Sequence, residues 1–184
     1  MTRILAVCGS LRAGSFNNGV LIAAQAVLPP ATTLMRYNAL AEVPAFNPDQ
    51  DTEEVPAAVA HWRTALAAAD AILIASPEYA FGVPGALKNA LDWVVSSGEF
   101  VDKPTAVITA SSSGAGGDKA SAALVQTLRV MSASVSDDAI LLIPQVAIHF
   151  GLDGEIKHTD SAASLGAVLA TLCNAVHDRE KDTV

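Results

Sequence analysis

The amino-acid sequence predicts an α/β fold in which helices cover both faces of one doubly wound, five-stranded parallel sheet. The chain has 184 residues, of which 51% are hydrophobic and 16% charged, enough for one sizeable core and unlike a disordered segment. Five short runs are apolar or β-branched, as in strands buried on both faces. A helix-like segment follows each run, and such β-α-β units favour parallel pairing.

The first helix lies between the first two strands in the sequence. The apolar run "RILAVC", at residues 3–8, predicts the first strand. The helix-like segment over about 17–28 ends at Pro29 and Pro30, because proline cannot continue a helix. The β-branched run "TTLMRY", at 32–37, predicts the second strand.

A long connection leads to the third strand. The polar, proline-bearing stretch 38–55 predicts a surface loop. A proline then opens a helix over about 56–69, in a first-turn position where proline is tolerated. The apolar run "AILIAS", at 71–76, predicts the third strand, and a second proline opens the helix over about 84–95.

The last two strands follow the same pattern. The run "PTAVITA", at 104–110, predicts the fourth strand, and the Ser/Gly loop 111–118 leads to a helix over about 119–131. The run "AILLIP", at 139–144, predicts the fifth strand, and the chain ends in a helix over about 161–179. No repeat or linker interrupts the pattern, so we expect residues 1–184 to form one domain.

Five parallel strands with right-handed crossovers predict the flavodoxin-like order 2-1-3-4-5, with a three-layer arrangement of helices, sheet and helices. Such sheets bind ligands beyond the carboxyl ends of their strands, where the strand order reverses. Three loops with unusual chemistry follow the first, third and fourth strands: "GSLRAGSFN" at 9–17, "PEYAFGVPG" at 77–85 and "SSSGAGGD" at 111–118. Because these strands are neighbours in the predicted order, we expect the three loops to meet.

The first loop has the composition of an anion site. Ser10, Ser15 and Asn17 supply hydrogen-bond donors, the next helix directs its positive end there, and Arg12 adds a full charge. A helix cap beside an exposed arginine is the other interpretation. The loop lacks the lysine of a Walker A motif, and it lacks the G-x-G-x-x-G of a dinucleotide grip.

The other two loops resemble the walls of a ring pocket. Tyr79 and Phe81 offer flat apolar surfaces, although ordinary packing or a subunit contact would explain them as well. Glu78 could pair with a polar ring edge or stand as an exposed loop acid. The Ser/Gly loop adds backbone donors and little bulk. A phosphate-binding loop, together with an aromatic wall and a wall of small residues, favours a mononucleotide with a large ring, such as flavin mononucleotide, FMN.

The stretches "GSLRAGSFN" and "SPEYAFGVPGALKNALDW" resemble the two signature segments of the NADPH-dependent FMN reductase family, a flavodoxin-like group that includes quinone and chromate reductases. The resemblance extends from the first strand through the fifth. It implies an enzyme that passes hydride from NADPH or NADH via FMN to a quinone or a similar small acceptor, or to free flavin. The chemistry would belong to the flavin, so no protein side chain is predicted to be catalytic.

The resemblance also implies roles by position: residues of the first loop hold the FMN phosphate, and the other two loops enclose the isoalloxazine ring. The cofactor-binding residues predicted in this way are Ser10, Arg12, Ser15, Phe16, Asn17, Pro77, Glu78, Tyr79, Ala80, Phe81, Ser111, Ser112, Ser113, Gly114 and Gly117. Two features depart from the family pattern. Ala80 replaces the asparagine that often follows "PEY", which predicts a more apolar pocket mouth, and the third loop carries no arginine for the 2′-phosphate of NADPH.

Two other hypotheses remain open. One is a flavodoxin-like FMN electron carrier that does not itself oxidise NAD(P)H, and the other is an interaction module without flavin. The spacing of the four histidines excludes motifs such as H-E-x-x-H, so no metal site is predicted.

Charge and composition limit the partners and the location. The net charge of −8, without a Lys/Arg-rich stretch, disfavours nucleic acid and anionic membranes. There is no signal-peptide pattern and no apolar run long enough to span a membrane, and the two cysteines read as reduced thiols. We therefore expect a cytoplasmic protein. The resemblance of the helix "PGALKNALDW" adds the expectation of a homodimer or homotetramer.

Overall fold

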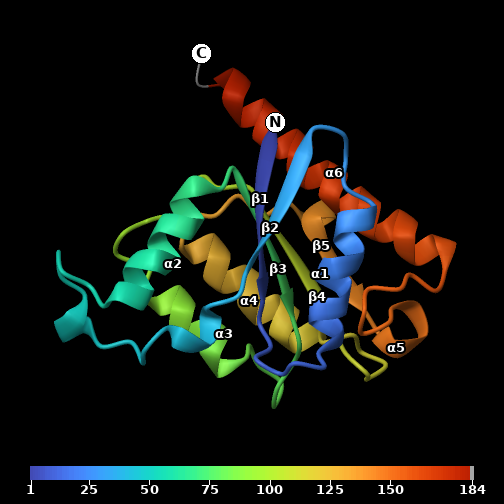
Figure 1. Ribbon diagram of the computed structural model, residues 1–184, viewed down its shortest axis with the longest axis horizontal. Coiled ribbons are helices and arrows are strands. Elements are labelled where there is room, and N and C mark those ends of the chain that lie inside the picture. Colours follow the sequence, from blue (N-terminus) through green and yellow to red (C-terminus); the bar gives the residue numbers. More distant parts are fainter. Residues whose placement is uncertain (183–184) are drawn as a thin grey trace.

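The strands form one parallel sheet in the order β2-β1-β3-β4-β5, which confirms the predicted topology (Figure 1). The computed structural model describes residues 1–182. The strands are β1 (Thr2–Cys8), β2 (Thr32–Tyr37), β3 (Ala71–Ser76), β4 (Thr105–Ala110) and β5 (Ile140–Ile143). Every residue of β3 and β4 is buried, which explains why these runs are almost entirely apolar.

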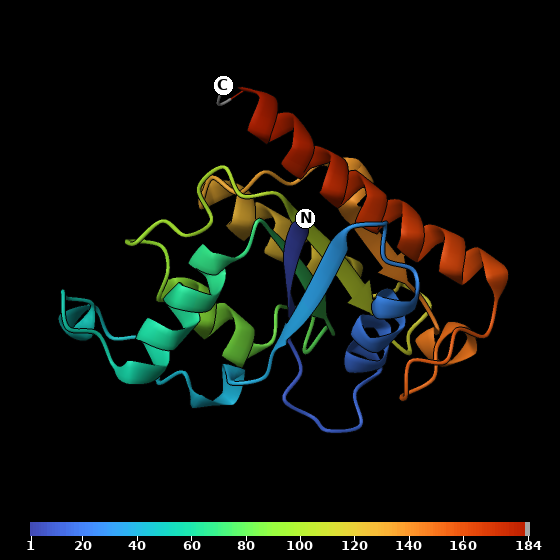
Figure 2. The ribbon, with the colours of Figure 1, turned by 45° about the horizontal axis from the view of Figure 1, so that its top comes forward.

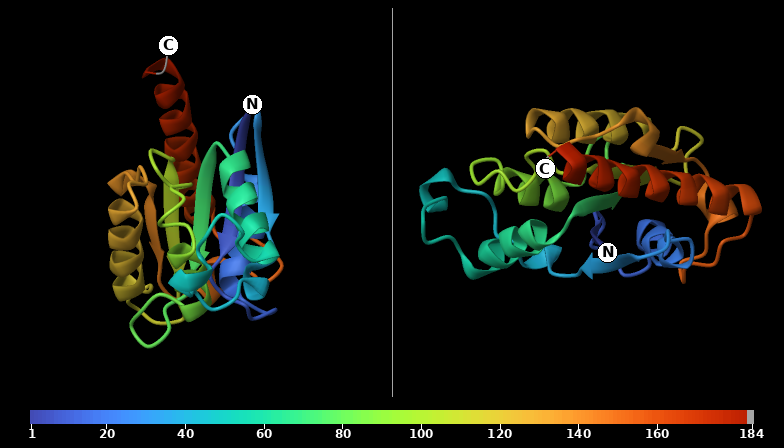
Figure 3. Two further views of the ribbon diagram at one scale, coloured as in Figure 1. Left: turned by 90° about the vertical axis from the view of Figure 1, so that its left-hand side faces the viewer. Right: turned by 90° about the horizontal axis from the view of Figure 1, so that it is seen from above.

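Helices cover both faces of the sheet. The α-helices are α1 (Phe16–Ala26), α2 (Ala57–Ala68), α3 (Gly85–Asp92), α4 (Asp118–Val130), α5 (Val146–His149) and α6 (Thr159–Asp182), and the 3₁₀ helices are η1 (Leu40–Glu42), η2 (Pro48–Gln50) and η3 (Asp137–Ala139). One hydrophobic cluster joins α1 and α6 to one face of the sheet, and a second joins α2, α3 and α4 to the other. Figure 3 shows these two layers on opposite sides of the sheet, as the three-layer prediction requires.

The loops that follow the strands gather at one end of the sheet. The last turns of α6 extend past the opposite end, beside the start of β1 (Figures 1 and 2). Any site built from the loops after β1, β3 and β4 therefore lies far from the chain's C-terminal helix end. Within residues 1–182, none of the helices combines the length and the hydropathy that crossing a membrane requires.

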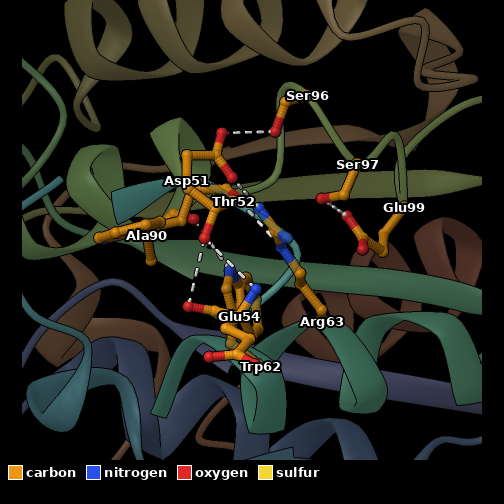
Figure 4. A network of polar contacts seen from close by, with 10 residues as sticks. Asp51, Thr52, Glu54, Trp62, Arg63, Ala90, Ser96, Ser97 and Glu99 are labelled. Atoms are coloured by element: carbon orange, nitrogen blue, oxygen red, sulfur yellow. Dashed lines mark hydrogen bonds and ion pairs between the residues drawn. The ribbon is translucent and has the colours of Figure 1, made fainter. Parts of the chain in front are cut away.

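Hydrogen bonds connect the predicted surface loop 38–55 to α2 and to the segment that follows α3 (Figure 4). The Asp51 carboxylate accepts hydrogen bonds from the Ser96 hydroxyl at 2.6 Å and from Arg63 Nη2 at 2.7 Å. The Arg63 guanidinium also donates to the carbonyl oxygen of Trp93, at 2.6 Å from Nη2. The hydrogen bond from Ser96, followed by that from Arg63, lowers the pKa of Asp51 below its ordinary value. The loop is thus part of the packed structure on the α3 side.

The secondary structure differs from the prediction in the short helix α5, in the three 3₁₀ helices and at several ends. The short helix α5 was not predicted, because four residues are too few to show a helical period. Gln145, which precedes it, has a left-handed backbone with φ of 46°. The helix α3 ends at Asp92 rather than at Val95, and α6 extends beyond the predicted segment at both ends.

Candidate functional site

The three loops predicted to meet do enclose one cavity, of about 220 Å³, at the carboxyl ends of β1, β3 and β4. Figure 1 shows these loops together at the lower end of the sheet. The cavity is lined by Ser10, Arg12, Gly14, Ser15, Phe16, Asn17, Pro77, Glu78, Tyr79, Ala110, Ser111, Ser112 and Val146. All five predicted residues of the first loop are among them, with Pro77, Glu78 and Tyr79 from the second loop.

The first loop presents a positive charge that no protein group within residues 1–182 neutralises. Ser15 is the N-cap of α1, yet its hydroxyl makes no capping hydrogen bond, and the first turn of α1 carries no acidic residue. The guanidinium of Arg12 lies beside Gly14 and has no ion-pair partner among residues 1–182. An uncapped helix N-terminus next to an unpaired arginine fits an anion such as a phosphate group.

Asn17 holds the first loop to the end of β4. Its side-chain Nδ2 donates to the carbonyl oxygen of Ala110 at 3.0 Å, and the Ala110 amide donates to Asn17 Oδ1 at 3.3 Å. The side chain is almost fully buried, at 2% exposure. One amide hydrogen of Asn17 is not used in these bonds and could still be donated to a phosphate. The predicted phosphate contact therefore stays a prediction, in addition to this structural role.

Tyr79 connects the second loop to the first. Its hydroxyl lies 3.1 Å from Ser10 Oγ, so the two loops are joined by a hydrogen bond across the cavity. The Tyr79 side chain is 51% exposed while it lines the cavity, so its ring forms part of the cavity's open side.

Glu78 stabilises the helix that follows the third loop. Its Oε2 accepts hydrogen bonds from the backbone amides of Lys119, at 3.0 Å, and Ala120, at 2.9 Å. The N-cap of α4 is Gly117, which has no side chain to fill this role. The carboxylate therefore caps α4 from another loop, which neither interpretation of Glu78 in the sequence anticipated. Its predicted role at the ring edge remains a prediction.

The second loop ends in a tight hairpin that the sequence did not predict. The Tyr79 amide donates to the Gly82 carbonyl at 3.1 Å, and the Gly82 amide returns a bond to the Tyr79 carbonyl at 3.0 Å. The two central residues, Ala80 and Phe81, have φ angles of 50° and 59°. Such two-residue turns favour Asn-Gly, because positive φ is unfavourable for other side chains. Alanine and phenylalanine gave no signal for this turn.

Five of the predicted residues do not line the cavity: Ala80, Phe81, Ser113, Gly114 and Gly117. Gly117 has a packing role, because a Cβ atom there would lie 3.3 Å from the Cβ of Thr109. Conversely, Gly14, Ala110 and Val146 line the cavity and were not predicted. Val146 belongs to α5, the helix that was missed, and Ala110 carries no chemistry that a sequence pattern could mark.

The surroundings of the cavity show no metal site and a protonated thiol. Within residues 1–182, no three His, Cys, Asp or Glu side chains lie close enough together to hold a metal ion. Burial raises the pKa of Cys8, at the end of β1, which keeps the thiol protonated near neutral pH. Cys8 and Cys173 are both free thiols. A larger depression, of about 420 Å³, lies between β5 and the start of α6, and its lining includes no residue of the three loops.

Comparisons with known proteins agree with this geometry. A family described as NADPH-dependent FMN reductase matches residues 2–147. The chain is 38% identical over 128 residues to an NAD(P)H-dependent FMN reductase of Pseudomonas aeruginosa, covering 68% of this chain and 69% of that protein. It is 32% identical over 136 residues to a quinone reductase of Escherichia coli, covering 72% of each chain.

A solved structure supports the fold over almost the whole length. The flavoenzyme FerB of Paracoccus denitrificans, an NAD(P)H:acceptor oxidoreductase, superimposes with a TM-score of 0.87. The match covers 97% of this chain and 98% of FerB, at 23% sequence identity. Because the identity is low, this likeness bears on the fold alone.

Proposed function

Since the chain belongs to the NADPH-dependent FMN reductase family, we propose that it is an FMN-dependent enzyme that transfers electrons from NAD(P)H to a quinone or a similar small acceptor. The balanced reaction is NAD(P)H + H⁺ + quinone → NAD(P)⁺ + quinol. The observation that carries the proposal is the unpaired Arg12 at the uncapped start of α1, inside a cavity that three loops enclose. The family prediction made from the two sequence segments is confirmed.

The residues of the cavity fit FMN by their charge and their hydrogen-bonding groups. Arg12, the Ser10 and Ser15 hydroxyls and the first amides of α1 would bind the phosphate. Pro77 and Tyr79 on one side, with Ser111 and Ser112 on the other, would enclose the ring. When bound, FMN supplies the redox chemistry, accepting electrons from one substrate and giving them to the next.

The protein's own contribution is position. The bond between Ser10 and Tyr79 fixes the gap between the first two loops, and Asn17 fixes the first loop to β4. Glu78 ties the second loop to α4, so the two walls of the ring pocket would hold their spacing without the cofactor. No residue of the third loop selects a 2′-phosphate, so the proposal covers both NADPH and NADH.

The proposal extends to the protein's assembly and location. Residues 1–184 act as one domain, and two copies or four associate through the helix that follows the second loop. Exposed valines near that helix, Val95 at 59% and Val101 at 49%, support such self-association. A cytoplasmic location is supported by the two free thiols and by a substrate, NAD(P)H, of that compartment.

The visible spectrum tests the function. The purified protein is supplied with FMN, and NADPH or NADH is added without oxygen. Bleaching of the flavin bands, and their return when 1,4-naphthoquinone is added, is the expected result. Flavin that stays oxidised after both nucleotides would indicate an electron carrier instead, and failure to bind FMN at all would remove both flavin hypotheses.

An arginine variant tests the phosphate site separately. Arg12→Ala should weaken FMN binding by more than about tenfold, because a charge-assisted hydrogen bond is lost. The affinity is measured by fluorescence titration of the protein without cofactor. Arg129→Ala is the matched control, since Arg129 pairs with Asp137 on the α4 side and does not line the cavity. Equal FMN affinities in the two variants would remove Arg12 from the phosphate site.

A further inference from the structure

The side chain of Phe81 stands outside the cavity that its loop helps to form. It is 78% exposed, although phenylalanine is normally buried. It is not among the residues that line the 220 Å³ cavity, whereas Tyr79, two residues earlier, is. The hairpin between β3 and α3 projects beyond the end of the sheet, next to the loop after β1 (Figure 1). Phe81 is therefore a free aromatic ring beside the entrance of the site.

The backbone that presents this ring is strained. Ala80 and Phe81 both have left-handed φ angles, which alanine and phenylalanine disfavour. Two hydrogen bonds between Tyr79 and Gly82 hold the turn in place. Strain of this kind persists where the surrounding structure imposes it, and it is concentrated at binding sites and ligand clamps. An exposed ring on a strained turn therefore lowers stability in two ways.

The second loop and the loop that Tyr79 contacts expose apolar side chains next to the charge of Arg12. The loop that Tyr79 contacts exposes Leu11, at 56%, and Tyr79 itself is half exposed. Glu78, the acidic residue of the second loop, directs its carboxylate to the amides at the start of α4 instead. This side of the entrance thus offers flat and apolar surface, which suits a planar, uncharged molecule.

We propose that Phe81 determines specificity for the electron acceptor, by contacting planar apolar acceptors such as quinones at the entrance of the site. This inference rests on the proposed function and adds the residue that selects among the acceptors. Phe81 would contact the acceptor rather than FMN, because its ring lies outside the cavity that fits the cofactor. Compact, highly charged acceptors such as ferricyanide would gain nothing from the ring.

The experiment compares Phe81→Ala with the wild-type protein, both saturated with FMN. Alanine keeps the Cβ atom, so the strain of the turn stays while the ring is lost. The ratio of kcat/KM for 1,4-naphthoquinone to kcat/KM for ferricyanide should fall about tenfold, through KM for the quinone, as expected when one aromatic contact is removed. Phe46→Ala is the matched control, since Phe46 is partly exposed but packs on Trp93 outside the cavity.

A binding measurement separates this proposal from the function on which it rests. The affinity of the oxidised, FMN-loaded protein for 1,4-naphthoquinone is measured without NAD(P)H, by quenching of flavin fluorescence. The dissociation constant should rise about tenfold in Phe81→Ala and stay within twofold in Phe46→Ala. This result can be obtained even if NAD(P)H fails to reduce the flavin, which would disprove the reductase but not the role of Phe81.

Three outcomes would overturn the proposal. One is that the dissociation constant of Phe81→Ala for naphthoquinone stays within twofold of the wild-type value, or that the wild-type protein binds no naphthoquinone. Another is an equal loss with both acceptors, which would mean that the ring supports the cofactor. The third is a change in oligomeric state, measured by light scattering, without a change in the acceptor ratio, which would make Phe81 a contact between two copies of the chain.

Discussion

The strain in the hairpin predicts that replacing Ala80 with glycine stabilises the protein. Ala80 has φ of 50°, and a left-handed backbone costs an L-residue about 1–2 kcal/mol. Glycine removes this cost, but it adds about 0.5–1 kcal/mol of chain entropy to the unfolded state. The difference leaves a net gain of about 0.5–1 kcal/mol in the free energy of unfolding. For a chain of this size the gain corresponds to a rise in Tm of about 1–4 °C.

The measurement is thermal or urea unfolding of the two proteins without cofactor, which keeps FMN binding out of the comparison. The matched control is Ala170→Gly, an exposed position inside α6, where glycine should lower the free energy of unfolding by about 1 kcal/mol. The same substitution should thus have opposite signs at the two sites. A Tm for Ala80→Gly at or below that of the wild-type protein would refute the claim that the hairpin is strained.

Two further predictions concern contacts outside the ring pocket. Glu78→Ala should lower the free energy of unfolding by about 1–2 kcal/mol, because the amides of Lys119 and Ala120 lose their acceptor. An unchanged midpoint of urea unfolding would mean that water replaces the carboxylate as the helix cap. Asp51 has a lowered pKa in the folded state. Its contribution to the free energy of unfolding is therefore complete above the ordinary carboxyl pKa of about 4, and it is lost as the pH falls through the pKa of the folded state. The stability difference between the wild-type protein and Asp51→Asn should therefore shrink with falling pH below about 4, and a difference that is constant between pH 7 and pH 2 would contradict the assignment.

The strand order and the meeting of the three loops could be predicted from the sequence, because both depend on patterns longer than a few residues. Runs such as 71–76 are apolar throughout, since both faces of the strand are covered, and that signal is hard to mistake. The order of the strands then follows from the handedness of the crossovers. Once β1, β3 and β4 are neighbours, their loops have to meet, whatever the details of each loop.

The direction of each polar side chain could not be predicted in the same way. Asn17 and Glu78 have the chemistry of ligand-binding residues, and both line the cavity. Yet the side chain of Asn17 hydrogen-bonds to the backbone of Ala110, and that of Glu78 to the backbone amides of Lys119 and Ala120. A sequence states which donors and acceptors a loop contains, but the partner of each one depends on a neighbouring loop. Arg12 differs from these two residues because its guanidinium has no ion-pair partner in the part of the chain that the structure describes.

This difference gives the two kinds of residue separate experimental signatures. Removing a group that binds protein, such as Glu78, should lower stability with and without cofactor. Removing Arg12 should leave the stability of the cofactor-free protein nearly unchanged, because its guanidinium has no ion-pair partner among the described residues 1–182. The change should act on FMN affinity alone. Phe81 would form a third class, with effects on the acceptor only. The three variants therefore assign the phosphate grip, the supporting contacts and the entrance of the site independently of one another.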